Sequence, residues 1–295
     1  MTHHWQASMR RGLPLLLGLL LCLGLPASAW AKERLFWLLR DLPPLTIFEG
    51  TGKGQGVIDQ LLPLLIEQMP EYDHSVIRVN RARGIQMLQE SSFTCDPTLL
   101  WTPERARYVH FSIPSLGVLS SGLVIRRKDQ HLLESYLHND KVDLQALLGH
   151  TPLKLGVVAQ RSYSPAVDEL LKTLPDTTLS RHYGNDAVTS LLQMQQHDRL
   201  QLVLGYWPEV RYLLQQQGWS PDDYAFYPVQ GVEQYQLLRV GCSDTPLGRE
   251  AISHINKLLL GLRNDTLPDL YAQWLAPQMR EQYRHDSLRL FGEHP

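Results

Sequence analysis

The sequence predicts an α/β fold of two lobes, each an open sheet flanked by helices, with two hinge crossings of the chain between the lobes. Three observations support this prediction. The 295 residues are enough for two domains of roughly 100–150 residues. Strand-like and helix-like segments alternate along the chain, which is typical of open α/β sheets. Two extended stretches, at 117–127 and 230–240, stand where the chain would pass between the lobes.

The first 29 residues are predicted to be a secretory signal peptide. Arg10 and Arg11 precede the apolar run GLPLLLGLLLCLGLP, and the small residues ASA end at Ala29. A membrane anchor is the alternative, but this run is shorter than the roughly 20 apolar residues that span a bilayer. We therefore expect cleavage after Ala29 and a periplasmic protein.

The charge of the chain argues against a nucleic-acid partner. The sequence has 28 basic and 30 acidic residues, and two of the basic ones lie in the predicted signal peptide. Removing these two leaves 26 basic against 30 acidic residues, a formal charge of −4. Nucleic-acid binders are basic, with their charge clustered on one face.

The first lobe, predicted at residues 30–118 and 231–295, is expected to alternate between strand and helix. An apolar stripe with helical spacing includes Ile58, Leu61 and Leu65. Thr102 and Pro103 are residue types that begin helices. Strands are expected at 34–41, 74–80, 95–101 and 235–243, and helices at 57–70, 82–90, 102–109, 246–263 and 267–275.

The second lobe is predicted at residues 119–230. Val167, Leu170, Leu171 and Leu174 recur at helical spacing, and Pro208 and Gly218 bound another helix. Strands are expected at 154–159 and 200–206, and helices at 164–174, 185–196 and 208–218.

Two cysteines, Cys95 and Cys242, remain after the predicted signal peptide is removed. An even number of cysteines in an exported protein favours a disulfide. The alternative is a pair of buried free thiols.

No motif in the chain indicates catalysis, a metal site or a cofactor. The sequence contains no H-E-x-x-H or Cys/His cluster and no G-x-S-x-G segment. The stretch GTGKGQG at 50–56 matches neither phosphate-binding pattern, so a loop before a helix is the simpler interpretation. We expect no enzyme activity, no metal and no cofactor.

The segment TPERARYVHFSIP, at 102–114, resembles the T-x-x-R-x-x-x-x-x-F-S-x-P signature of the family 3 extracellular solute-binding proteins. These are the periplasmic receptors of polar amino-acid importers. PPLTIFEGTGKGQGVIDQLLPLL and LKLGVVAQRSY are similar to other segments of that family. The similarity extends across the mature chain and is closest to an uncharacterised proteobacterial branch. It implies the type 2 periplasmic-binding fold.

The resemblance implies that Arg105 pairs with a ligand carboxylate, because a guanidinium presents a fork of donors suited to that group. A helix beginning at Thr102 would add its free N–H groups. The alternative is a surface Arg105 paired with Glu104 or Asp96.

Two departures from the family bear on the ligand. Arg161 stands in a turn that is usually Gly-Thr or Gly-Ser and adds a second candidate cation beside Ser162. Tyr206 stands where the family usually has an aspartate for the α-ammonium, although Asp41 or Glu209 could compensate. We therefore expect an organic acid or modified amino acid without a free α-ammonium.

Aromatic residues are further candidates for the walls of the cleft, with core or rim positions as the alternative. The complete set of candidate ligand-binding residues is Asp41, Phe48, Trp101, Thr102, Arg105, Arg161, Ser162, Tyr163, Tyr206 and Trp207.

These observations predict a monomeric periplasmic solute-binding protein that captures a small carboxylate-bearing solute and closes on it by a hinge motion. The expected partner is an inner-membrane ABC-type permease. The alternatives are a dehydratase-like enzyme on the same scaffold and a soluble sensor subunit of a signalling system.

Overall fold

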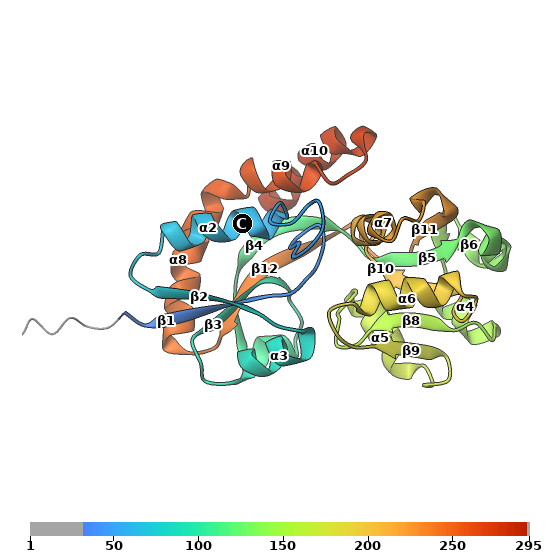
Figure 1. Cartoon of the computed structure of the whole chain (residues 1–295), viewed down its shortest axis with the longest axis horizontal. Helices are drawn as coiled ribbons and strands as arrows, with labels where there is room; N and C mark the ends of the chain where they lie inside the picture. Colours follow the sequence, from blue (N-terminus) through green and yellow to red (C-terminus); the bar gives the residue numbers. More distant parts are fainter. Residues whose placement is uncertain (1–31, 294–295) are drawn as a thin grey trace, which may run out of the picture. The chain divides into compact units, whose positions relative to one another are not determined.

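The computed structural model describes residues 32–293, and residues 34–295 belong to one compact unit that contains two five-stranded sheets (Figure 1). The predicted signal peptide, residues 1–29, lies outside the described residues. Within residues 32–293, no helix is both long enough and apolar enough to cross a membrane.

The first sheet has the strand order β2-β1-β3-β12-β4. Strand β1 runs parallel to β2 and β3, whereas β12 runs antiparallel to β3 and β4. The strands are β1 (Arg34–Leu39), β2 (Asp73–Arg78), β3 (Thr94–Leu100), β4 (Val109–Leu119) and β12 (Tyr235–Ser243).

Helices cover this sheet because packing on it buries their apolar faces away from water. The predicted stripe of α2 is buried with Trp37 of β1 and with Ile255 of α8 in one core. The helices are α2 (Val57–Glu67), α3 (Arg81–Gln89), α8 (Pro246–Leu262), α9 (Thr266–Ala272) and α10 (Arg280–Glu293).

The second sheet has the order β11-β5-β10-β8-β9. Its strands are β5 (Gly122–Arg126), β8 (Leu155–Val158), β9 (Leu179–His182), β10 (Leu202–Gly205) and β11 (Tyr224–Pro228). Leu202 and Leu204 of β10 belong to one apolar cluster and Val203 to another, as strand alternation requires. The two clusters show that both faces of this sheet are covered.

Four α-helices supply the cover: α4 (Leu144–His150), α5 (Pro165–Thr173), α6 (Ala187–Gln196) and α7 (Trp207–Gln216). Leu147 of α4 and Val167 of α5 pack in the cluster that holds Leu202. Leu191 of α6 and Val210 of α7 pack in the cluster that holds Val203. A 3₁₀ segment (Arg127–Tyr136) and the short strands β6 (Leu137–His138) and β7 (Lys141–Val142) precede α4.

The two connections between the sheets run side by side. Strand β4 ends at Leu119 and β5 begins at Gly122, while β11 ends at Pro228 and β12 begins at Tyr235. The Ser120 N–H donates to the carbonyl oxygen of Gln234 at 2.9 Å, joining the two connections. Both fall within the stretches predicted as crossings. The lobe boundaries at 118 and 230 stay predictions.

The predicted helix at 102–109 is wrong. Only a 3₁₀ turn forms, at Arg105–Arg107. The Thr102 hydroxyl does accept a hydrogen bond from the Arg105 N–H at 3.2 Å, as a capping residue would. The chain then enters β4 at Val109, whose pairing with β12 ends the helical path after one turn.

Several short or polar elements were not predicted from the sequence. Strands β9 and β11 and helix α4 have four to seven residues, too few for a clear period. Helix α10 has the mostly polar sequence REQYRHDSLRLFGE, which carries almost no apolar stripe. Tertiary contacts of a few side chains, such as the buried Tyr283 and Phe291, hold this helix in place.

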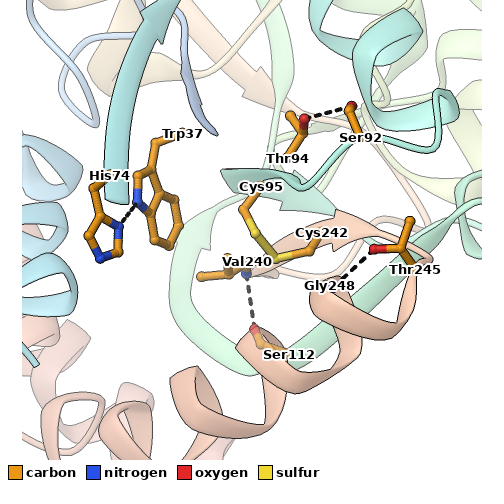
Figure 2. Close-up of a disulfide and its surroundings, with 10 residues drawn as sticks. All are labelled: Trp37, His74, Ser92, Thr94, Cys95, Ser112, Val240, Cys242, Thr245 and Gly248. Carbon is orange, nitrogen blue, oxygen red and sulfur yellow. Dashed lines mark hydrogen bonds between the residues drawn. A yellow bond between two sulfur atoms is a disulfide. The ribbon is translucent and has the colours of Figure 1, made fainter. Parts of the chain in front are cut away.

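A disulfide joins Cys95 of β3 to Cys242 of β12, and both residues are fully buried (Figure 2). These cysteines face each other in the antiparallel register of the two strands, with 4.0 Å between their Cα atoms. Nearby, the Val240 N–H of β12 donates to the Ser112 hydroxyl of β4 at 3.0 Å. The disulfide therefore ties the returning strand β12 to the centre of the first sheet, across 147 residues of sequence.

We expect the Cys95→Ala/Cys242→Ala double variant to lose stability, because the bond closes a loop that includes the whole second sheet. The chain-entropy estimate for so long a loop is about 5 kcal/mol, and measured losses of 2–5 kcal/mol are typical. Urea unfolding of the oxidised chain and of the variant measures the difference. Two free thiols in the denatured, unreduced chain from residue 30 onward would contradict the disulfide.

Candidate functional site

A cavity lies between residues of the two sheets and the loops that follow their strands. The volume of this cavity is about 60 Å³, so a solute held in this conformation is small. The cavity is lined by Leu42, Pro43, Pro44, Leu45, Arg81, Thr98, Leu100, Arg105, Val118, Arg161, Ser162, Tyr206, Pro208, Glu209, Leu238 and Tyr271.

The wall of the cavity from the first sheet is largely apolar. Leu42, Leu45, Val118 and Leu238 line it, and all four pack on the core of that sheet. The Tyr271 hydroxyl, at the same wall, accepts a hydrogen bond from the Leu119 N–H at 3.2 Å. This side of the cavity suits a hydrocarbon group.

Arg105 is buried at the edge of this cavity and has no carboxylate partner among residues 32–293. Its guanidinium donates to the carbonyl oxygens of Leu100 at 2.9 Å and of Gln160 at 3.4 Å. Burial, followed by the charge of Arg40, lowers the pKa of Arg105. Pairing with Glu104 or Asp96, the alternative weighed from the sequence, does not occur.

Asp96 instead belongs to a buried pair with Arg40, which follows β1 directly. The Asp96 carboxylate also accepts hydrogen bonds from the Thr98 N–H at 2.9 Å and from the Thr98 hydroxyl at 2.8 Å. Arg40 donates to that same hydroxyl oxygen. The charges of Arg40 and Asp96 thus neutralise each other within the first lobe.

Arg161 forms a buried, bidentate ion pair with Glu209, with N–O distances of 2.8 and 2.9 Å. The Arg161 guanidinium also lies over the ring of Tyr206, 5.6 Å from its centroid. Burial lowers the pKa of Arg161, but the charge and hydrogen bonds of Glu209, with smaller contributions from Tyr163 and Tyr206, raise it, so that the net shift is upward. Arg161 therefore brings no uncompensated charge to the cleft, in contrast to the expectation of a second free cation.

Tyr206 lies between β10 and α7 and lines the cavity. Its hydroxyl donates to the Gln236 side-chain oxygen at 3.0 Å or to the Ser162 carbonyl oxygen at 3.3 Å. Burial raises the pKa of the Tyr206 hydroxyl, so this group stays neutral. Tyr206 therefore presents a neutral hydroxyl to the cavity.

Arg81 is the site residue that the sequence analysis missed. It is the first residue of α3 and lines both the main cavity and a smaller one beside it. Its Nε is buried without a hydrogen-bond partner. A signal for it does exist in the sequence: in open α/β sheets, ligand sites lie beyond the carboxyl ends of parallel strands, and Arg81 follows such a strand.

The other predicted site residues are divided between several places. Trp101 and Thr102 line a wider groove on the far side of Arg105, together with Ser162, which also reaches the main cavity. Asp41 lines the smaller cavity with Arg40 and Arg81. Its carboxylate accepts a hydrogen bond from the Phe48 N–H at 3.1 Å. Burial raises the pKa of Asp41, as do the charges of Glu49 and Glu209.

Three predicted aromatic residues do not line the main cavity. Tyr163 packs in the core of the second sheet, and its hydroxyl accepts a hydrogen bond from the Val158 N–H at 2.8 Å. Trp207 stacks on Phe226 at 5.8 Å. Phe48 packs against the first core, with Arg78 over its ring at 4.4 Å. Tyr163 also lines the wider groove beside Arg105, and the ligand-binding role of these three residues stays a prediction.

No cluster of three or more His, Cys, Asp or Glu side chains that could hold a metal ion occurs within residues 32–293.

The buried ion pair between Arg161 and Glu209 can be tested by substitution of each partner. Arg161→Gln or Glu209→Gln should each destabilise the protein by about 3–5 kcal/mol, because each leaves a buried charge unpaired, and the double variant should lose less than the sum. Urea unfolding of the four proteins measures this coupling. Lys172→Gln, which breaks the exposed pair with Glu169, is the control and should change little. Additive single effects would contradict a buried pair.

No protein-family model and no curated protein matches the chain. Solved structures do match it. A P235GK mutant of ArgBP from T. maritima has 16% identity and a TM-score of 0.61, over 82% of this chain and 95% of that chain.

Two further matching structures are a sensor domain and a transport protein. A histidine kinase sensor domain with similarity to periplasmic binding proteins has 14% identity and a TM-score of 0.63, over 83% and 97% of the two chains. The substrate binding protein of an amino acid ABC transporter has 13% identity and a TM-score of 0.60, over 82% and 99%. The chain therefore has the two-lobe periplasmic binding protein fold.

Proposed function

We propose that the protein is a periplasmic solute-binding protein that captures a small carboxylate-bearing solute for an ABC-type importer. The observation that carries this proposal is the buried Arg105 at the cavity, which has no carboxylate partner among the described residues. A buried charge without a counter-charge is costly, so a site of this kind favours an anionic ligand. The planar guanidinium favours a carboxylate in particular.

The two carbonyl oxygens that Arg105 contacts indicate how a bound carboxylate would be held. The two carbonyl oxygens that Arg105 contacts come from opposite sides of the cleft, since Leu100 ends β3 and Gln160 follows β8. A carboxylate that replaces the longer contact, at 3.4 Å, would be held between residues of both sheets. Binding and closure of the cleft would then be coupled.

The solute is expected to lack a free α-ammonium. Tyr206 offers a neutral hydroxyl, and the Glu209 carboxylate is already engaged by both terminal nitrogens of Arg161. Asp41 lines the smaller cavity, but its raised pKa weakens its preference for the charged form that an ammonium would need. An organic acid, or an N-modified amino acid without an ammonium group, needs no free carboxylate in the cavity.

A sensor role is the second candidate, because a histidine kinase sensor domain shares the fold. In that role the same site would report its solute to a membrane signalling protein instead of a permease. Permease and ATPase genes beside the coding sequence would favour transport, and a kinase or cyclase gene would favour signalling. Export by the signal peptide, the monomeric state and the absence of turnover belong to the proposal in either role.

Arg105→Ala should weaken binding of the solute at least about tenfold, equivalent to roughly 1.4 kcal/mol, because a charge-assisted hydrogen bond is lost. Isothermal titration calorimetry with the acid that gives the largest thermal shift in a screen of organic acids measures this change. Arg34→Ala, at an exposed ion pair with Asp73, is the matched control. Unchanged affinity in Arg105→Ala would remove Arg105 from the site.

Deaminated acids should bind more tightly than the corresponding α-amino acids. The physical reason is that no uncommitted carboxylate in the cavity meets the ammonium, whose burial alone costs several kcal/mol. Calorimetry on pairs such as 4-methylpentanoate and leucine, or pentanedioate and glutamate, measures the difference. Sub-micromolar binding of an ordinary α-amino acid would refute this expectation.

A further inference from the structure

We propose that the solute carries two anionic groups, one bound by Arg105 and the other by Arg81, so that a small dicarboxylate is the preferred class. This inference rests on the proposed function, because it assumes that Arg105 holds the first carboxylate. It assigns a ligand-binding role to Arg81, at the start of α3, and narrows the solute from acids in general to diacids.

The first support is that Arg81 is a cation with no protein partner. Its guanidinium makes no hydrogen bond or ion pair with any of residues 32–293, and its Nε is buried. It nevertheless lines the same cavity as Arg105. A long, flexible, charged side chain would normally turn toward solvent, so its placement at two cavities indicates a binding position.

The second support is the balance of charge around the cavity. Four arginines, Arg40, Arg81, Arg105 and Arg161, lie close enough for the other three to lower the pKa of Arg81 after burial. Asp96 neutralises Arg40, and Glu209 neutralises Arg161 through two hydrogen bonds.

Arg81 and Arg105 are left without a carboxylate. Asp41, the remaining acid at the smaller cavity, accepts its hydrogen bond from a backbone N–H, and neither arginine is among the groups that shift its pKa. Two uncompensated cations call for two anionic groups on the ligand.

A third observation concerns the smaller cavity. Across it from Arg81 lie Ala187 and Val188, in the first turn of α6, and no side chain caps that helix. The backbone N–H groups of a helix start favour a negative charge. Arg81 begins α3, which packs on the first sheet, and α6 packs on the second, so an anionic group here would meet donors from both lobes.

The part of the solute between its two anionic groups would lie against apolar residues. Leu45, Val118 and Leu238 line the cavity together with both arginines. The available space is small. A short hydrocarbon chain with a carboxylate at each end fits this combination better than a sugar or a peptide.

The test compares diacids with monoacids of the same chain length by isothermal titration calorimetry on the chain from residue 30. The pairs are propanedioate and propanoate, butanedioate and butanoate, pentanedioate and pentanoate, and hexanedioate and hexanoate. At one length or more, the diacid should bind at least about tenfold more tightly than its monoacid. Arg81→Gln should remove that preference and leave the monoacid affinity within about twofold, because only the second anionic group loses its partner.

Arg83→Gln is the matched control, since Arg83 lies on the same helix, is exposed and pairs with Glu90. It should keep the diacid preference. A second readout uses no ligand: removing an unpaired cation from the cavity should raise the melting temperature of Arg81→Gln above that of the wild type.

The outcomes separate the two proposals. Equal binding of diacid and monoacid at all four lengths would overturn this inference and leave the proposed function standing. A diacid preference that persists in Arg81→Gln would remove Arg81 from the site. Binding of neither series to the wild-type protein would overturn both proposals.

Discussion

The repulsion between four arginines that line two neighbouring cavities is the constraint around which the candidate site is organised. Each of the four follows the carboxyl end of a parallel strand: Arg40 after β1, Arg81 after β2, Arg105 after β3 and Arg161 after β8. Arg40, Arg105 and Arg161 have buried side chains, so their charges are weakly screened. Acids pair with two of the four arginines, Arg40 and Arg161, and in the proposed function an anionic solute would pair with the other two.

The two internal acids come from elements that the sheets place with little freedom. Asp96 is part of β3, between β1 and β12, so its carboxylate is fixed beside Arg40 by strand pairing. Glu209 lies in the first turn of α7, which is packed on the second sheet through Val210 and Leu214. The disulfide between β3 and β12 holds the same region of the first sheet. Stability of the first sheet and neutralisation of Arg40 therefore both depend on β3.

Periodicity and residue type were sufficient to predict most of the fold. The apolar stripe of α2, the alternation of strands with helices and the two cysteines each correspond to a feature of the structure. Arg105 was found through the resemblance of its segment to a family signature. Ion pairs between residues far apart in the sequence could not be predicted, because no local pattern links them. Arg161 and Glu209 are 48 residues apart, and Arg40 and Asp96 are 56 residues apart. Trp207 was assigned to the cleft because aromatic residues are common in pockets, but its stacking on Phe226, outside the lining of the main cavity, could not be read from the sequence.

An unpaired cation in the cavity lowers the stability of the free protein, and the same cation strengthens binding of an anionic solute. The two effects are linked, because a ligand that binds only the folded state stabilises it by about 2.7 kcal/mol at a hundred times its Kd. The penalty at Arg81 and Arg105 is therefore present only while the site is empty. A protein with cores on both faces of its second sheet and a disulfide across its first can tolerate such a penalty. In the proposed function, the uncompensated charge at the carboxyl ends of the strands would make selectivity for anions a property of the charge balance and not of any single contact.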